Sequence, residues 1–256
     1  MRTLLALLTA AVLLGVVGTA VRADSAGFVY AYALHDSHTG ETFYSADALK
    51  PFGAPLPFRP YVELLLQRES RSDGTLVPQI LNDNYGLVAG GVQYQGGRGF
   101  RAFAQIGQAF AFGPQLPTAW SLGNSDFRGG VELFRSWTDG HHQVGSVFAS
   151  SIYYSRYRND ILYAQAERGY ELGRSERPFQ LYLRLSGDAD SRRFFYNNVV
   201  SATMGARYLP LGHLGPSLAL EQSYSDFIGP LAPVTAAGES RQFSSFRPVL
   251  SFGTSF

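Results

Sequence analysis

Hydrophobic and polar residues alternate along most of the chain with a period of two. From Phe179 to Ser186 the odd positions are Phe or Leu, and the even positions are Gln, Tyr, Arg and Ser. Residues 198–208, 217–224 and 246–256 repeat this alternation with few interruptions. Because successive side chains of a β-strand point to opposite faces, each segment predicts a strand with one apolar and one polar face.

Weaker alternation occupies six earlier segments, and clusters of Gly, Pro, Asn, Asp and Ser separate all ten. We predict ten strands on this basis, with Phe28–Leu34 as a candidate eleventh. Ser45–Leu49 is interpreted as one helical turn, and the proline-rich stretch 51–60 as a lead-in outside the sheet. The six weaker segments are 59–68, 84–95, 99–110, 126–137, 144–157 and 160–172.

Alternation of this kind fits either a soluble β-sandwich or a membrane barrel with lipid outside and a polar lumen. Most segments here are about ten residues long, which suits a tilted membrane-crossing strand better than a globular one. Short and long connections also alternate, as in bacterial barrels, except at 138–143 and 158–159. We therefore predict an all-β, closed antiparallel transmembrane barrel of about ten strands, with eight and twelve as alternatives.

The final strand supports the barrel. It ends on Phe256 after an alternating stretch, 249–255. This resembles the last strand of bacterial outer-membrane proteins, in which a terminal Phe belongs to the signal read by the barrel-assembly machinery. An edge strand that ends in Phe by chance is the alternative. We interpret Phe256 as an assembly signal.

Composition excludes several other classes of protein. The chain has 256 residues, 45% hydrophobic and 14% aromatic, too many for a disordered chain. It has no Cys, which excludes disulfide scaffolds and thiolate chemistry. The formal net charge is +1 and mean hydropathy is -0.05, so charge gives no case for a nucleic-acid partner.

The N-terminus predicts export. Met1–Thr3 carries a positive charge, Leu4–Val17 is largely apolar, and Val21–Ala23 has the residues that a signal peptidase reads. An uncleaved anchor is the alternative, but the apolar stretch is shorter than the roughly 20 residues of a spanning helix. We predict a cleaved signal peptide over 1–23, a periplasmic segment or plug over 24–58, and a barrel over 59–256 in the outer membrane of a Gram-negative bacterium.

The polar faces predict which side chains enter the lumen. In a narrow lumen such charges must be paired, because an unpaired buried charge costs several kcal/mol. A network of ion pairs that plugs the barrel is one interpretation, and a selective channel with an Arg-set anion preference is the other. The predicted lumen network consists of Glu63, Arg101, Glu132, Glu167, Arg184, Arg207, Glu221 and Arg247.

Signals for catalysis are weak. The chain has five His, and His141 and His142 lie in a predicted turn without further metal ligands. A lipid hydrolase could use His213 with Ser217, or His142 with Ser146, but Ser is too common for proximity to be informative. The chain has no G-x-S-x-G, H-E-x-x-H or Walker motif. We predict no catalytic residue, no metal and no cofactor.

Five short stretches carry a family resemblance: 67–73, 81–85, 126–130, 154–160 and 192–198. Together they resemble the C-terminal β-barrel of the bacteriophage adsorption protein A type, which is found behind helical repeats in exopolysaccharide secretion. This chain lacks the helical repeats. The resemblance implies an envelope barrel associated with surface polysaccharide and usable as a phage receptor, with no catalytic residues.

We therefore expect a non-enzymatic envelope barrel that assists polysaccharide export or binds a surface ligand. A lipid-modifying outer-membrane enzyme and a small diffusion channel are the alternatives. The expected partners are outer-membrane lipid, the barrel-assembly machinery, and surface polysaccharide or periplasmic export components.

Overall fold

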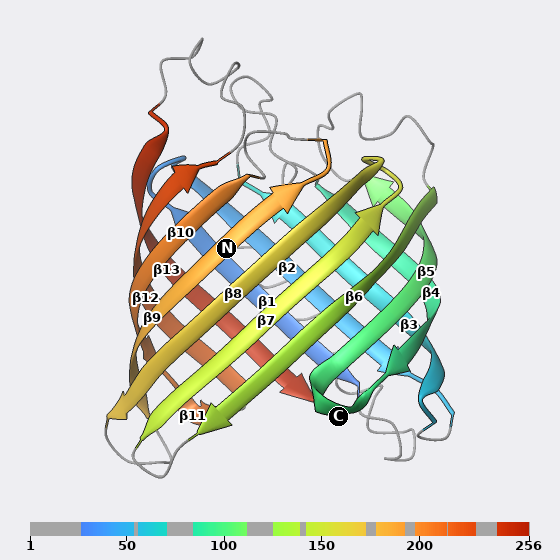
Figure 1. Ribbon diagram of the computed structural model, residues 1–256, viewed down its shortest axis with the longest axis horizontal. Helices are drawn as coiled ribbons and strands as arrows, with labels where there is room; N and C mark the ends of the chain where they lie inside the picture. Colours follow the sequence, from blue (N-terminus) through green and yellow to red (C-terminus); the bar gives the residue numbers. More distant parts are fainter. Residues whose placement is uncertain are drawn as a thin grey trace.

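Twelve strands close into a single antiparallel barrel in the computed structural model (Figure 1). The structure describes residues 27–53, 56–70, 84–111, 125–138, 142–172, 178–192, 198–213, 215–228 and 240–255. A short strand, β11 (Pro210–His213), and a 3-10 turn, η1 (Gly97–Gly99), lie in two of the connections. The barrel strands are β1 (Phe28–Asp36), β2 (Glu41–Pro51), β3 (Phe58–Glu69), β4 (Tyr85–Gln95), β5 (Phe100–Ala111), β6 (Ser125–Thr138), β7 (Gln143–Tyr154), β8 (Asn159–Leu172), β9 (Phe179–Asp190), β10 (Val199–Tyr208), β12 (Gly215–Phe227) and β13 (Gln242–Ser255).

Each barrel strand pairs with the barrel strands before and after it in sequence, and the ring closes where β1 pairs with β13. In the closing pair Phe28 lies opposite Ser255 and Leu34 lies opposite Val249. The ring therefore has no free edge, as a structure surrounded by hydrocarbon requires.

The strand count of twelve corrects the predicted ten. Of the two additional strands, β1 confirms the candidate eleventh strand at Phe28–Leu34, and β2 was not predicted. Both lie within the segment 24–58 that was predicted to be a periplasmic segment or plug. The helical turn predicted at Ser45–Leu49 is part of β2. Four outward positions of β1 and β2 are Ala, and the inward positions mix aromatic, aliphatic and acidic residues, so the alternation in polarity is weak. Ala is also a strong helix former, which favours the helical interpretation of Ser45–Leu49. Residues 1–26, which include the predicted signal peptide, lie outside the described residues.

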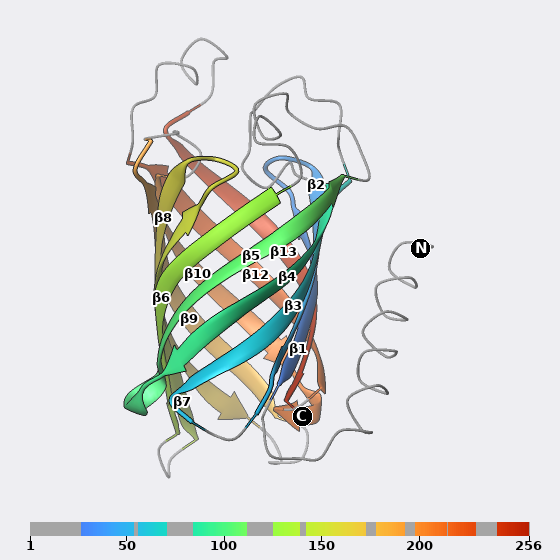
Figure 2. The same cartoon turned by 90° about the vertical axis from the view of Figure 1, so that its right-hand side faces the viewer.

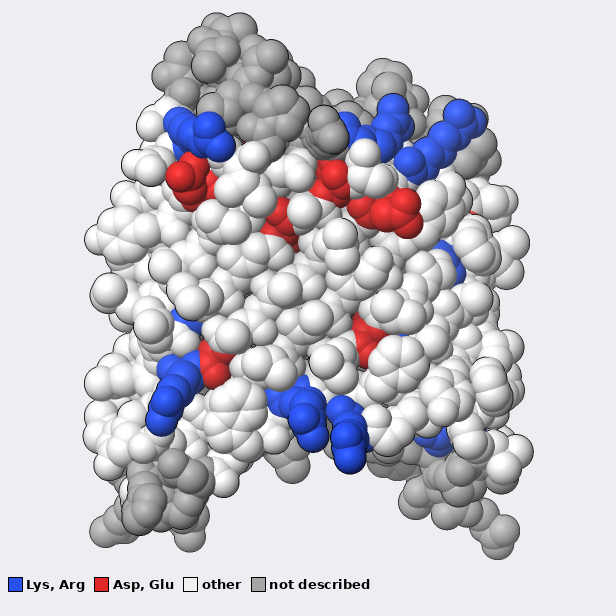
Figure 3. Space-filling view, in the orientation of Figure 1, with Lys and Arg blue, Asp and Glu red and all other residues white. Residues whose placement is uncertain are grey.

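The outer surface is apolar, as the alternation predicts. On β9, Leu181, Leu183 and Leu185 are each about half exposed, while Tyr182 between them is 5% exposed. In the space-filling view most charged residues form an upper and a lower band, with a largely uncharged belt between them (Figure 3). The predicted division into a lipid-facing apolar face and a polar inner face thus holds along the barrel wall.

Aromatic side chains gather on the outer surface where strands end. Phe58, Tyr94 and Phe100 form one such cluster, with ring centroids 4.9 and 6.3 Å apart. Phe127 and Tyr153 form a second pair at the other end of the barrel, with ring centroids 6.5 Å apart. Aromatic girdles of this kind mark the two interfaces of a membrane-spanning barrel.

The longest connections, 70–84, 112–124 and 228–241, all join strands at the same end of the barrel. Both the start of β1 and the end of β13 lie at the other end (Figures 1 and 2). Bacterial outer-membrane barrels have their longer loops on the extracellular side, so we expect this end to be the extracellular one. The alternation of short and long connections fails where the sequence indicated that it would. The connections 139–142 and 155–158 lie at opposite ends of the barrel but have the same length.

The barrel is oval in cross-section, since it is wide in Figure 1 and narrower in the view turned by 90° (Figure 2). The short dimension brings β1 toward β8 and β9. Tyr163 on β8 lies within electrostatic reach of Tyr32 on β1, and Tyr30 on β1 within reach of Arg184 on β9. Side chains from opposite walls therefore approach each other at the narrow part of the lumen.

Glycines allow inward tyrosines to lie flat against the neighbouring strand. Gly205 lies opposite Tyr182 and Gly91 lies opposite Tyr61 in the strand register. A Cβ at either glycine would collide with the tyrosine ring across from it. These pairs are the aromatic coverage of strand glycines that pins register in curved sheets. No helix among the described residues is long and apolar enough to span a membrane.

Candidate functional site

The largest polar network lies on the inner faces of β8, β9, β10 and β12. Glu167 accepts hydrogen bonds from both terminal nitrogens of Arg207, at 3.1 and 3.2 Å. Glu221 accepts from Arg184 at 2.5 Å and from the Tyr182 hydroxyl at 2.5 Å. Arg184 also lies 3.9 Å from Glu167, which joins the two ion pairs. Four of the eight predicted lumen residues thus form one network, together with Tyr182.

Tyr182 holds this network together through its ring as well as its hydroxyl. The guanidinium carbon of Arg207 lies 4.3 Å from the ring centroid, and that of Arg184 lies 5.7 Å away. A cation over an aromatic face is attracted by the ring quadrupole, more strongly where water is excluded. Both arginines are therefore fixed by a carboxylate and an aromatic face, a geometry that leaves little freedom to the side chains.

Arg101 and Glu132 form a second cluster on β5 and β6. Their ion pair is 2.8 Å long, and Arg101 Nε donates to the side-chain oxygen of Gln93 at 2.9 Å. The Arg101 guanidinium lies over Phe103 at 4.5 Å and near the Tyr61 ring at 5.4 Å. The cluster repeats the arrangement of Arg184 and Arg207 on another part of the wall.

Arg247 belongs to a third group, separate from the first two. Its Nε donates to Asp36 at 2.8 Å, and Asp36 also accepts from the Ser245 hydroxyl at 2.7 Å. The backbone N–H of His38 donates to Asp36 at 2.9 Å. Asp36 was not among the predicted lumen residues, because the candidate strand Phe28–Leu34 ended two residues before it.

Glu63 does not join any of these groups. It is 8% exposed, and it makes no hydrogen bond or ion pair with the residues that the structure describes. Asp47 lies nearby on the inner face of β2, where Leu49 is the register partner of Glu63. One carboxylate oxygen of Asp47 is buried and likewise has no hydrogen-bond partner among the described residues. The structure thus divides the predicted network into three groups and one separate carboxylate.

A fourth group consists of Asp126, Arg128 and Tyr85. The alternation in polarity also predicts that Arg128 enters the lumen, but Asp126 and Tyr85 were not among the predicted lumen residues. Arg128 donates to Asp126 through two nitrogens, at 3.1 and 2.8 Å, and to the Tyr85 hydroxyl at 2.8 Å. Its guanidinium lies 5.2 Å from the Tyr154 ring. The spacing of Asp126 and Arg128, two residues apart on one strand, was the signal that could have paired them.

Tyrosines form much of the inner surface of the barrel wall. A tyrosine has an apolar ring and a polar hydroxyl, so it can enter a polar lumen if the hydroxyl finds a partner. Such partners are present, since Tyr61 donates to Gln105 and Tyr163 donates to Gln165 at 2.6 Å. The inward tyrosines are Tyr30, Tyr32, Tyr61, Tyr85, Tyr154, Tyr163 and Tyr182.

The described histidines have partners that give no catalytic set. His35 pairs with the Thr42 hydroxyl at 3.0 Å, His38 stacks on Phe243 at 4.3 Å, and His142 lies beside Tyr170. No group of three or more potential metal ligands occurs among the residues the structure covers. His141, the His213 side chain and Phe256 lie outside the described residues.

Comparisons with known proteins add little detail. No protein-family model and no curated protein matches the chain. Three solved structures are similar over most of their length. An outer-membrane channel from Pseudomonas putida F1 has a TM-score of 0.44 and 11% identity, and the match covers 92% of this chain and 97% of that chain. The β domain of the Bordetella autotransporter BrkA has a TM-score of 0.41 and 14% identity, with 90% of this chain and 99% of that chain covered, and a bacterial polysaccharide outer-membrane secretin has a TM-score of 0.41 and 8% identity, with 92% and 100% covered.

The chain's own features are informative: a closed antiparallel ring, an apolar outer belt and an inner face of paired charges. Together they make the chain a membrane-spanning β-barrel.

Proposed function

We propose that this protein is a non-enzymatic barrel that takes a hydrophilic solute of the saccharide class through its lumen, as one component of surface-polysaccharide export. The observation that carries the proposal is the inner surface, where tyrosine rings alternate with ion-paired arginines and amide side chains. The resemblance to barrels of the phage adsorption protein A type supports the same setting. A signal peptide over 1–23 and assembly through Phe256 would bring the chain to the outer membrane of a Gram-negative cell.

The tyrosines suit a sugar chain for a chemical reason. A sugar ring has apolar C–H faces and a polar rim of hydroxyl groups. A tyrosine presents a flat apolar ring with a hydroxyl at its end, so it matches both parts. Seven inward tyrosines lie on six different strands, from β1 to β9, so ring faces are available around much of the lumen.

The pairing of the arginines bears on the charge of the solute. Arg101, Arg128, Arg184, Arg207 and Arg247 each form an ion pair with a carboxylate. Rings of unpaired Arg set anion preference in pores. With these five arginines neutralised, the inward charges without an ion pair include Arg59 and Glu63, which are opposite in sign, so the described part of the lumen has no ring of unpaired Arg and favours a neutral solute over an anionic one. The anion-selective channel considered from sequence is therefore the less favoured alternative.

Planar bilayers test the proposal. The purified full-length protein should give discrete conductance steps, and a neutral malto-oligosaccharide added to one side should interrupt them transiently. Replacing Tyr30 and Tyr32 by Ala should widen the narrow part of the lumen, raise conductance and shorten the interruptions. Tyr153→Ala, a change to an outward tyrosine, is the matched control. Silent bilayers, or steps that the oligosaccharide never interrupts, would refute the proposal.

A further inference from the structure

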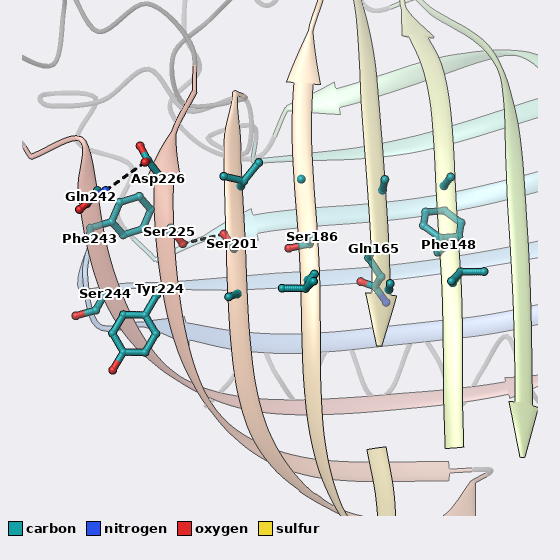
Figure 4. Close-up of a pocket in the computed structure, with 18 residues that line it drawn as sticks. Phe148, Gln165, Ser186, Ser201, Tyr224, Ser225, Asp226, Gln242, Phe243 and Ser244 are labelled. Atoms are coloured by element: carbon teal, nitrogen blue, oxygen red, sulfur yellow. Dashed lines mark hydrogen bonds between the residues drawn. The ribbon is translucent and has the colours of Figure 1, made fainter. Parts of the chain in front are cut away.

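A long apolar groove runs across the outer surface of the barrel (Figure 4). Its volume is about 1160 Å³, and it crosses β7, β8, β9, β10, β12 and β13. Each of these strands contributes two outward side chains. The floor is made of small residues, Ala149, Ala164, Ala166, Gly187 and Ala202, while Leu185, Val200 and Tyr224 form the sides.

The groove descends from the extracellular rim into the membrane. It begins at Asp226 and Gln242, where β12 ends and β13 begins, and it reaches Val147 in the lower half of β7. Strands lie about 4.8 Å apart, so crossing six strands covers roughly 24 Å along an oblique path. One leaflet of the hydrocarbon core is roughly 15 Å deep. The groove is therefore long enough to hold an extended acyl chain through the depth of one leaflet.

The upper end of the groove carries a basic group with free donors. Arg241 is 54% exposed, and its Nε donates to Asp226 at 3.1 Å. Gln242 also donates to Asp226, at 3.3 Å. The two terminal nitrogens of Arg241 have no acceptor among the described residues. Asp226 lowers the net charge at this end of the groove, but the two terminal nitrogens of Arg241 can still donate hydrogen bonds to an anionic group.

We propose that this groove binds an acyl chain of an outer-leaflet lipid, with the anionic headgroup at Arg241. The position on the lipid-facing surface, the apolar floor and the basic upper end all fit that occupant. Transfer of an acyl chain out of water favours every part of the membrane alike, so specificity must come from the fit of the groove and from the headgroup contact. The proposal does not depend on passage of a solute through the lumen.

Native mass spectrometry of the full-length protein in detergent tests this site. Dipalmitoyl phosphatidylglycerol added to the delipidated protein should form a one-to-one adduct, more abundant than the adduct with dipalmitoyl phosphatidylcholine. Ala202→Phe fills the floor and should lower adduct abundance several-fold for both lipids. Arg241→Gln should remove the preference for phosphatidylglycerol and leave phosphatidylcholine binding unchanged.

A control variant separates this site from general lipid association. Ala104→Phe places the same ring on an outward position of β5, away from the groove, and should leave adduct abundance unchanged. Heat-modifiable migration on gels confirms that each variant is folded. Equal adduct abundance in the wild type, Ala202→Phe and Ala104→Phe would overturn the proposal. So would an unchanged lipid preference in Arg241→Gln.

Discussion

Replacing Glu221 by Ala should destabilise the barrel far more than the same change at Asp226. Both residues pair with an arginine, but Glu221 is 4% exposed, whereas Asp226 at the rim is 38% exposed. Without Glu221, the Arg184 guanidinium and the Tyr182 hydroxyl lose the acceptors that lie 2.5 Å from them. The contrast tests whether burial decides the value of an ion pair in this lumen.

The size of the effect follows from what remains around Arg184. Removing one partner of a buried pair costs about 3–5 kcal/mol, because the other charge stays uncompensated. Glu167, 3.9 Å from Arg184, compensates in part, and the arginine side chain is 19% exposed. We therefore expect a loss of about 3 kcal/mol for Glu221→Ala. An exposed pair contributes about 0–1 kcal/mol, so Asp226→Ala should cost at most about 1 kcal/mol.

Reversible urea unfolding in detergent micelles, followed by heat-modifiable migration, measures both changes. A second variant isolates the cause. Adding Arg184→Met to Glu221→Ala removes the unpaired cation and should restore part of the lost stability. If Glu221→Ala is no more destabilising than Asp226→Ala, or if Arg184→Met makes it worse, burial of an uncompensated guanidinium is not the reason for the loss.

Three further predictions concern backbone, lipid face and topology. Gly99→Ala should lower the free energy of unfolding by about 1–3 kcal/mol, because Gly99 has a φ of 79° and an added Cβ would meet the Phe134 carbonyl. Gly97 has open space around it, so Gly97→Ala should have little effect in the same urea titration. Met204→Arg, at an outward position in the middle of β10, should lower the free energy of unfolding in lipid vesicles by about 2–4 kcal/mol, whereas Leu211→Arg in β11 should lower it by about 0–1 kcal/mol. Equal losses would contradict a membrane position for the uncharged belt. Protease added to intact vesicles should leave a protected core of nearly full length and cut only in the connections, and complete digestion would contradict the barrel.

Much of the barrel was predictable from alternation alone. The segments expected at 59–68, 99–110 and 160–172 correspond to β3, β5 and β8 within one or two residues at each end. The reason is physical: lipid on one side and a polar lumen on the other impose a period of two on every strand. The inward direction of Arg184, Arg207 and Glu221 follows from the same period.

The strand β2 and the pairing of the lumen charges could not be predicted, because alternation in polarity carries no information on register or side-chain reach. In β1 and β2 the inner face mixes Tyr30, Tyr32 and Leu49 with polar residues such as Asp47, and the outer face has four small Ala residues, so the two faces differ little in polarity. Which carboxylate pairs with which arginine depends on register and on reach across two strands, as between Arg207 and Glu167. The unpaired state of Glu63 likewise follows from its neighbours on β2 and β4 rather than from its own alternation.

The pairing of β1 with β13 has a consequence for how the chain reaches its final state. All other pairings join barrel strands that follow one another in the chain, so each closes over a single connection of at most about 15 residues. The last pairing joins Phe28 to Ser255 and must wait until both ends of the chain are present. Until then two strands have unsatisfied backbone N–H and C=O groups, which hydrocarbon does not tolerate. Loss of β13 alone would expose both β1 and β12, so assembly of this barrel is all-or-none at its seam.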